Sequence, residues 1–240
     1  MTHAKKIPAI ILMLIMLVSM LPSQVFAAKQ NGWWQDSSGH WYYYVDGQAV
    51  KGGWKKIGGK WYFFDNDAIM LSNTFIPEKS GNKYGCDFYY FDKSGAMVTS
   101  SWFNWMPTEK QSYWIYATKS GKAALDWKKI DGKWYFFNPA GIMIFYPSQP
   151  IDGKVYVFGS SGALVNKTGW VSAKHEGYTY WFYVKKGGIA TVGWKRVSGK
   201  WYYFSKSNGI MVSSCTMQIE NSDGSIVNYK FDKNGVCLNP

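Results

Sequence analysis

Tryptophan pairs are the residues of this sequence best suited to bind a ligand. Trp127 and Trp134 lie seven residues apart, on either side of Asp131 and Gly132. Two indole rings on one face of a hairpin form two walls of a box, and an aromatic ring from an adjacent hairpin would supply a third. Such a box holds a quaternary ammonium by cation–π attraction, worth roughly 0.5–2 kcal/mol per contact. A sugar ring stacking its C–H face on an indole is the alternative ligand.

Groups that could perform catalysis are sparse. His40 and His175 have no Ser or Cys in a setting typical of a nucleophilic triad. The 15 acidic residues lie mostly in turns, as Asp65 and Asp92 do, so turn formation explains them without a glycosidase carboxylate pair. No C-x-x-C spacing occurs among the three cysteines. The sequence therefore predicts no enzyme, no metal site and no cofactor.

The tryptophan pairs belong to a unit that recurs along the chain. Three copies are evident: GWKKIGGKWYFFDNDAIM from Gly53, DWKKIDGKWYFFNPAGIM from Asp126 and GWKRVSGKWYYFSKSNGIM from Gly193. Taking the second Trp of the unit as its anchor, equivalent positions follow at intervals of 20–21 or 26–27 residues, at Trp41, Trp61, Phe88, Trp114, Trp134, Val155, Trp181, Trp201 and Asn228. This periodicity indicates a tandem array of about nine units with insertions at one point.

Each unit is typical of a β-hairpin. Asp131-Gly132 is a two-residue type I′ turn signal, which predicts that Ile130 pairs with Lys133. Strand alternation then divides the side chains between two faces. One face carries Trp127, Lys129, Trp134 and Phe136, and the other carries Lys128, Ile130, Lys133, Tyr135 and Phe137. Because both faces bear aromatic rings, neighbouring hairpins must cover them, so we expect an all-β solenoid.

The composition agrees with this fold class. The 240 residues include 14 Trp, 18 Tyr, 14 Phe and 25 Gly. A disordered chain lacks such aromatic content, and a helical bundle contains fewer glycines. The aromatics are spread evenly, which predicts one repetitive domain over residues 28–240.

The first 27 residues are typical of a secretory signal peptide. Lys5 and Lys6 precede an almost wholly apolar run over residues 7–21, and Val25 and Ala27 are the small residues of a cleavage site. The sequence therefore predicts export, to the cell wall, the cell surface or the medium, and no membrane anchor after cleavage. The oligomeric state stays open.

Charge and cysteines leave alternatives open. A net charge of +12 attracts polyanions such as teichoic acids and acidic glycans, but isolated lysines on solvated strand edges are as good an explanation. No specific nucleic-acid partner is predicted. Cys215 and Cys237 could form a disulfide near the end of the sequence and leave Cys86 alone, or they could be a pair of free, buried thiols.

The units resemble a known repeat family. GWKKIGGKWYFFD, DWKKIDGKWYFFN and GWKRVSGKWYYFS, closing in Gly-x-Met at Gly141-Met143 and Gly209-Met211, are similar to the choline-binding, or cell-wall-binding, repeats of Gram-positive surface proteins and autolysins. The resemblance covers about residues 31–240. It implies a left-handed superhelix of hairpins, with the choline of teichoic acid held between successive repeats.

The resemblance also implies which residues form the boxes. The intact pairs are Trp34 with Trp41, Trp54 with Trp61, Trp127 with Trp134, and Trp194 with Trp201, and the candidate third walls are Tyr62, Tyr135 and Tyr202. Three methionines are candidates for the floor of the boxes, although a role as core filler is favoured: Met70, Met143 and Met211.

Several units depart from the pattern. The paired positions hold Phe75 and Phe88 in the third unit, Ser148 and Val155 in the sixth, and Thr216 and Asn228 in the ninth. We expect no choline site in the sixth and ninth units, and the last repeat, about residues 215–240, is expected to be a polar cap. The fourth and seventh units keep Trp102 with Trp114 and Trp170 with Trp181, but an insertion is expected to move these walls apart.

Three functions are compatible with these features. The first is a non-catalytic exported module that binds cell-wall polymers, above all choline-bearing teichoic acid. The second is a glycan-binding adhesin resembling glucan-binding tails or the receptor-binding repeats of clostridial toxins. The third is a structural spacer rod whose aromatic rings are all core.

Overall fold

The computed structural model describes residues 30–240, so the predicted signal peptide over residues 1–27 lies outside the described residues. Within 30–240 the regular elements are all β-strands, which confirms the all-β prediction. No helix in this part of the chain is long and apolar enough to cross a membrane. The chain divides into two compact units, whose described parts are residues 30–53 with 64–70 and residues 54–63 with 71–240.

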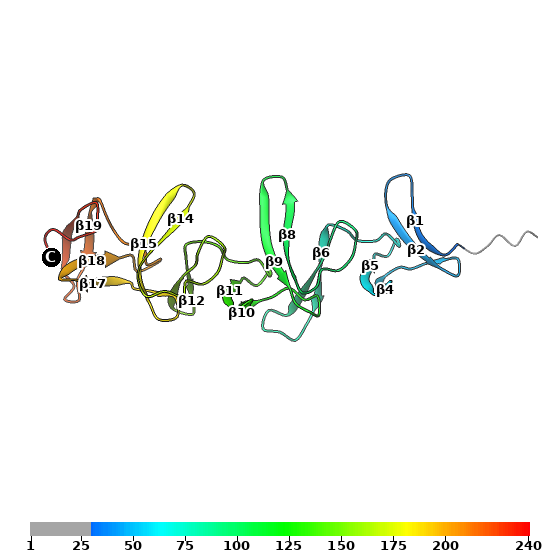
Figure 1. Ribbon diagram of the computed structural model, residues 1–240, viewed down its shortest axis with the longest axis horizontal. Coiled ribbons are helices and arrows are strands. Elements are labelled where there is room, and N and C mark those ends of the chain that lie inside the picture. Colours follow the sequence, from blue (N-terminus) through cyan, green and yellow to red (C-terminus); the bar gives the residue numbers. More distant parts are fainter. Residues whose placement is uncertain (1–29) are drawn as a thin grey trace, which may run out of the picture. The chain divides into compact units, whose positions relative to one another are not determined.

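Most strands pair in small antiparallel hairpins, which follow one another in chain order within the second unit (Figure 1). The first unit contains the three-stranded sheet β1 (Gly32–Gln35), β2 (Trp41–Val45) and β3 (Gln48–Ala49). The two-stranded sheets are β4 (Gly53–Ile57) with β5 (Lys60–Phe64), β6 (Thr74–Lys79) with β7 (Cys86–Phe91), β8 (Ser101–Thr108) with β9 (Gln111–Ala117), β10 (Asp126–Ile130) with β11 (Lys133–Phe137), β17 (Gly193–Val197) with β18 (Lys200–Phe204), and β19 (Cys215–Glu220) with β20 (Ile226–Phe231). One five-stranded sheet has the order β12 (Ser148–Ile151), β13 (Lys154–Val157), β16 (Ile189–Ala190), β15 (Tyr178–Lys185) and β14 (Gly169–His175).

The register of β10 and β11 is the one that the turn predicts. Ile130 lies opposite Lys133, and Trp127 lies opposite Phe136. Asp131 has φ of 47° and Gly132 has φ of 79°, and a type I′ turn requires positive φ at both of these positions. The local sequence therefore fixes which side chains share a face.

Successive hairpins are joined by a recurring backbone hydrogen bond. The residue that closes one unit donates its N–H to the carbonyl oxygen of the anchor residue of the preceding hairpin. Met97 donates to Trp61 at 2.8 Å, and Met143 donates to Trp114 at 2.7 Å. The same bond links Met70 to Trp41, Ala123 to Phe88, Leu164 to Trp134, Met211 to Trp181, and Cys237 to Trp201. This bond fixes the position of each anchor residue in the repeat.

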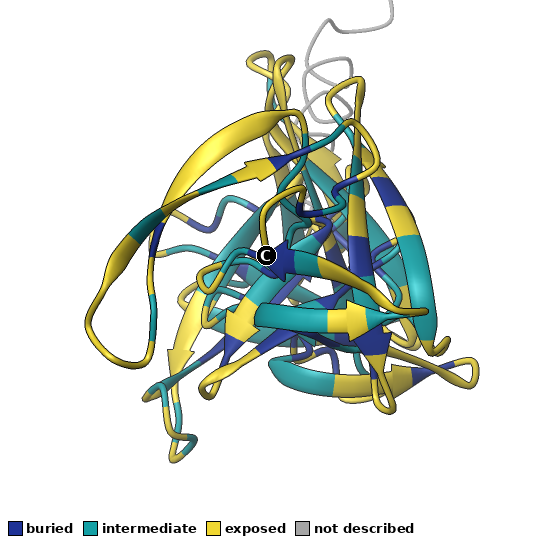
Figure 2. Ribbon diagram, turned by 90° about the vertical axis from the view of Figure 1, so that its left-hand side faces the viewer, coloured by how far each residue is buried: buried dark blue, intermediate teal, exposed yellow. Residues whose placement is uncertain are grey.

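The core consists of small clusters distributed along the hairpins. Buried residues lie within strands and in the segments that close each unit, as Met70 and Met143 do, whereas the turns at the hairpin ends are exposed (Figure 2). In six hairpins the second strand ends in, or is followed directly by, a phenylalanine that is almost or fully buried: Phe64, Phe91, Phe137, Phe158, Phe204 and Phe231. The trailing glycine packs against the preceding repeat, since a Cβ on Gly235 would lie 2.5 Å from the Met211 sulfur. A larger residue there would separate neighbouring repeats.

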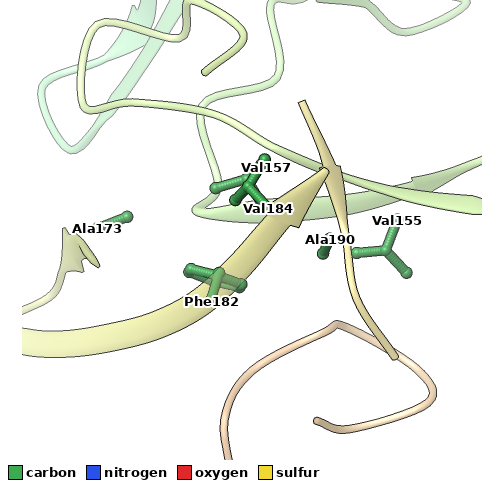
Figure 3. Close-up of a cluster of buried hydrophobic side chains, with 6 residues drawn as sticks. All are labelled: Val155, Val157, Ala173, Phe182, Val184 and Ala190. Carbon is green, nitrogen blue, oxygen red and sulfur yellow. The ribbon is translucent and has the colours of Figure 1, made fainter. Parts of the chain in front are cut away.

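The five-stranded sheet holds the most extensive of these clusters. Figure 3 shows its six buried side chains, which come from β13, β14, β15 and β16. They are Val155, Val157, Ala173, Phe182, Val184 and Ala190. Phe182 is completely buried and is the largest side chain of the cluster.

The cysteines are all free thiols. Cys215 is exposed at the start of β19, Cys237 is buried after β20, and Cys86 is partly buried at the start of β7. Cys215 and Cys237 form no disulfide and are free thiols, but of this pair only Cys237 is buried as the second alternative expected.

Candidate functional site

Two tryptophans of one hairpin meet edge to face, and this arrangement recurs. The first Trp lies on the first strand and the second Trp is the anchor on the second strand. Ring centroids are 6.4 Å apart for Trp54 and Trp61, with an interplanar angle of 89°. Trp194 and Trp201 are 6.3 Å apart at 89°. The two indoles therefore form adjacent walls of a corner.

The first unit has the same corner, but with a different tryptophan. Trp33 lies 6.3 Å from Trp41 at 86°, whereas Trp34 contacts Tyr42 and Tyr44. Trp33 also lies opposite Tyr43 in the sheet, as Trp127 lies opposite Phe136. The predicted pairing of Trp34 with Trp41 is therefore wrong by one residue. The alternation of side chains places Trp34 on the other face of β1.

The insertions leave the Trp pairs of the two longest hairpins intact. Trp102 and Trp114 are 6.5 Å apart, as are Trp170 and Trp181. The inserted residues extend the far end of each hairpin, beyond the strand segments that carry the pairs. The expectation that the insertion moves these walls apart is therefore wrong, and both pairs join the candidate site residues.

The next hairpin supplies the third wall. Tyr135 lies 4.9 Å from Trp102, and Tyr202 lies 4.8 Å from Trp170. These two residues lie where a third wall is expected, although the sequence does not show which pair each one completes. Three further tyrosines occupy the same place and escaped prediction: Tyr89, 5.1 Å from Trp54, Tyr156, 4.8 Å from Trp127, and Tyr229, 4.7 Å from Trp194. The third predicted tyrosine, Tyr62, follows Trp61 in β5 and is partly buried.

The anchor tryptophans are open to solvent, while their partners are partly sealed. The exposed fraction of the anchors Trp41, Trp61, Trp114, Trp134, Trp181 and Trp201 is 37–45%. In the second unit the first Trp of a pair is more enclosed, because it also packs against the buried phenylalanine of the next hairpin; in the first unit Trp33 is as exposed as Trp41. Trp102, for example, stacks on Phe137 at 5.9 Å. In these corners of the second unit, the first Trp therefore packs into the repeat, and the anchor Trp on the second strand remains available for a ligand.

The pair Trp127 and Trp134 has a related environment. Trp127 lies 4.8 Å from Tyr156 and stacks on Phe158 at 5.9 Å and 22°. Trp134 is 45% exposed. Here the residue that closes the following unit is Leu164 instead of a methionine.

Four of these corners line measurable cavities in the second unit. The cavity beside Trp102 and Trp114 has a volume of about 580 Å³, and the one beside Trp170 and Trp181 about 430 Å³. Those beside Trp54 and Trp194 measure about 290 and 330 Å³. The closing methionines Met97, Met143 and Met211 line three of the cavities, so these side chains form part of the box. Met70 is buried in the first unit.

The polar residues of the cavities differ in charge. Glu78 lines the Trp54 cavity and Lys233 lines the Trp170 cavity. The Trp102 cavity has three serines instead, Ser112, Ser160 and Ser161. The aromatic walls repeat, but the electrostatic potential at the mouths of the boxes does not.

An ion pair lies next to the Glu78 cavity. The Asp87 carboxylate, opposite Glu78 in the sheet, accepts hydrogen bonds from Lys122 at 2.7 Å and from Asn82 at 2.9 Å. Burial alone would raise the pKa of Asp87, but the bonds from Lys122 and Asn82 outweigh it and hold the pKa below its usual value. Burial raises the pKa of the Tyr89 hydroxyl, and the adjacent Glu78 carboxylate raises it further.

The space between one hairpin and the next is here called a junction. Two junctions whose first hairpin lacks a Trp pair are filled by side chains. In the third unit, Phe75 packs against Trp105 of the next hairpin at 5.0 Å and Tyr90 packs against Phe103 at 5.9 Å. In the sixth unit, Val155 belongs to the cluster around Phe182 (Figure 3). The absence of a choline site in the sixth unit remains a prediction, for which this packing gives a physical reason.

A sequence signal could have located the third walls. The residue after the anchor is a tyrosine in seven units, and the structure places four of these seven in box cavities: Tyr89, Tyr135, Tyr202 and Tyr229. The two exceptions are Ile115 and Phe182, both completely buried against a filled junction. Every tyrosine that lines a box cavity as a third wall thus occupies this position, and the two hairpins with another residue there fill a junction.

Family profiles match several parts of the chain. The choline-binding repeat matches residues 50–102, and the cell wall binding repeat matches residues 126–143 and 192–211. These segments of the chain are similar to choline-binding and cell wall binding repeats. The matched segments include three Trp pairs: Trp54 with Trp61, Trp127 with Trp134, and Trp194 with Trp201.

Curated relatives match this chain over a small part of their own length. Glucosyltransferase-S of Streptococcus mutans is 27% identical over 177 residues, covering 73% of this chain and 11% of the relative. Glucosyltransferase-I of Streptococcus downei is 27% identical over 264 residues, covering 88% of this chain and 16% of the relative. The chain thus spans a small part of each. Among solved structures, the modular autolysin LytC of Streptococcus pneumoniae has a TM-score of 0.47 at 25% identity, covering 86% of this chain and 46% of that chain.

Proposed function

We propose that this chain is a non-catalytic, exported binding module that attaches to cell-wall polymers by holding the choline groups of teichoic acid in its aromatic boxes. One observation carries the proposal. Each of four cavities brings together two perpendicular indoles and a tyrosine of the next hairpin, and the anchor indole is open to solvent. Three electron-rich faces around a cavity suit a trimethylammonium group.

The apolar and aromatic lining of the boxes supports this ligand. A trimethylammonium group has no hydrogen-bond donor, so it needs apolar and π contacts more than polar partners. The closing methionine adds a polarisable floor to three of the boxes. The match to choline-binding repeats points to the same ligand.

Multiple boxes on one chain would strengthen attachment to a repetitive polymer. If one box binds weakly, a second box binds the same polymer at a high effective concentration, and overall avidity rises without any new contact. The net charge of +12 would assist capture of phosphate-bearing polymers at low salt.

We also infer that the hairpins form a left-handed solenoid, with the last repeat, residues 215–240, as its cap. The recurring hydrogen bond from each closing residue to the preceding anchor supports stacking of successive hairpins. The handedness rests on the family resemblance, and an experimental structure of the exported chain tests it.

Retention on a choline resin tests the main proposal. The folded protein should bind the resin and elute with free choline, while an unrelated basic protein should elute with salt alone. Flow-through of folded protein would reject choline binding. A variant with Trp61, Trp114, Trp181 and Trp201 replaced by alanine removes the anchor indole of all four boxes and should lose retention, with its far-ultraviolet spectrum confirming that the strands remain.

A glycan-binding adhesin is the second candidate. The similarity to two glucosyltransferases over most of this chain favours it, since an exposed indole also stacks on sugar rings. A glycan array separates the two candidates, because glucan binding without choline retention would select the adhesin. The third candidate, a spacer rod, requires buried indoles, and the 37–45% exposure of the anchor tryptophans argues against it.

A further inference from the structure

The aromatic boxes carry different charges, and we propose that they therefore select different forms of the ligand. The Glu78 box prefers a bare quaternary ammonium, and the Lys233 box prefers an ammonium joined to a phosphodiester. This inference rests on the proposed function, since both ligands contain choline. The Trp102 box, lined by serines, has no such preference.

The Glu78 box carries an uncompensated negative charge. Glu78 and Asp87 lie directly opposite each other in β6 and β7, on one face of the hairpin. Lys122 is the nearby cation, and its Nζ lies 2.7 Å from the Asp87 carboxylate. Among residues 30–240, Glu78 has no ion-pair partner. Two carboxylates therefore share one lysine, which leaves one negative charge at the mouth of the box.

That charge distinguishes the two forms of the ligand. A carboxylate beside the three rings attracts a trimethylammonium group and adds to the cation–π attraction. The same carboxylate repels the phosphate of a phosphodiester only two carbons from the ammonium. The box should therefore bind choline more tightly than its phosphodiester.

The Lys233 box has the opposite charge. Lys233 lines the cavity with the hydroxyls of Thr179 and Ser213. The neighbouring Asp232 directs its carboxylate to the backbone N–H groups of Asn234 and Val236, both at 2.8 Å. Within the described part of the chain, Lys233 forms no ion pair.

An ammonium and two hydroxyls next to three aromatic rings match a zwitterion. The rings of Trp170, Trp181 and Tyr202 hold the trimethylammonium group, and Lys233 with Ser213 holds the phosphate oxygens. Without the phosphate, Lys233 repels the ligand. This box should therefore prefer the choline phosphodiester that occurs within a polymer chain.

Fluorine NMR resolves the boxes one at a time. The protein is labelled with 5-fluorotryptophan, and the resonances of Trp61, Trp114 and Trp181 are assigned with single Trp→Phe variants. Titration then uses choline and glycerophosphocholine as probes. We expect about a threefold preference for choline at Trp61, a preference of similar size for glycerophosphocholine at Trp181, and none at Trp114. Both preferences should shrink at high salt.

Charge-neutralising variants test the assignment. Glu78→Gln should abolish the preference at Trp61 alone, and Lys233→Gln should abolish the preference at Trp181 alone. Glu220→Gln and Lys206→Gln make the same charge changes at exposed positions outside both cavities and should leave all three ratios unchanged.

The outcomes separate this inference from the function on which it rests. If neither probe shifts any resonance of the folded protein, choline binding itself fails. If both probes bind but the ratios at Trp61 and Trp181 are equal, or survive Glu78→Gln and Lys233→Gln, choline binding stands and the charge selectivity is overturned.

Discussion

The third and fourth hairpins use the same two strand positions for opposite purposes. In β6 and β7 these positions hold Phe75 and Phe88, and the space beside them is filled by Trp105 of the next hairpin. In β8 and β9 they hold Trp102 and Trp114, and the space beside them is a cavity of about 580 Å³. An aromatic pair therefore becomes a box only when the next hairpin leaves it open.

The length of the following hairpin decides between the two outcomes. The hairpin β8–β9 extends past its Trp pair, and its reverse face carries Phe103, Trp105 and Ile115 into the junction before it. The hairpin β14–β15 does the same with Ala173 and Phe182 (Figure 3). One face of each long hairpin therefore fills the junction with the preceding hairpin, and the other face carries the Trp pair of a box.

The largest effect is expected where a filled junction loses its core. Phe182→Ala should lower the free energy of unfolding by about 3–5 kcal/mol, because the ring is fully buried and its removal leaves a cavity. Trp181→Ala, on the other face of the same strand, should cost only about 1–2 kcal/mol. Urea unfolding measures both. Equal losses would contradict the division between filled and open faces.

The second-largest loss of stability is expected at the filled junction between the third and fourth hairpins. Trp105→Ala should lower stability by about 2–3 kcal/mol, since this ring packs against both Phe75 and Tyr90. Met106→Ala changes an exposed neighbour and should have almost no effect. Thermal denaturation compares the two variants, and a stable Trp105→Ala protein would show that the junction is not held by this ring.

The third effect concerns binding. Trp114→Ala should weaken choline binding at its own box about tenfold, or about 1.4 kcal/mol, because one of three aromatic walls is lost. Trp105→Ala removes an indole from the filled side of the same hairpin and should leave this affinity unchanged. Choline titration monitored at Tyr135 by NMR provides the measurement. Equal weakening by both variants would argue against a local box.

The smallest effect follows from the ion pair beside the Glu78 box. The pKa of Asp87 is lower in the folded chain than in the unfolded one, so its stabilisation is complete above about pH 4 and is lost as pH falls through the folded pKa. Asp87→Asn should therefore cost about 1 kcal/mol at neutral pH and less at low pH. Urea unfolding across this range measures it, with exposed Asp67→Asn as the control. A constant difference would exclude the ion pair as the cause.

Sequence reasoning predicts the hairpins better than the boxes. The Asp131-Gly132 turn and the side-chain alternation give the observed register, because both act between residues close in sequence. The doublet Trp33-Trp34 gives the wrong partner for Trp41, since either indole satisfies the pattern and only the register separates them. The insertions in the fourth and seventh units indicate longer hairpins. The sequence does not show that the extra residues lie beyond the Trp pairs and leave the distance between the two indoles unchanged.

The sequence by itself determined the repeat, the turn and the two faces of each hairpin, since turn chemistry and strand alternation are local. Only the tertiary structure decided which junctions are open. Whether Trp102 meets a tyrosine and a cavity, or Phe75 meets Trp105, depends on the side chains that the next hairpin brings against it. Those contacts join residues 30 or more positions apart, and packing, not local preference, selects them.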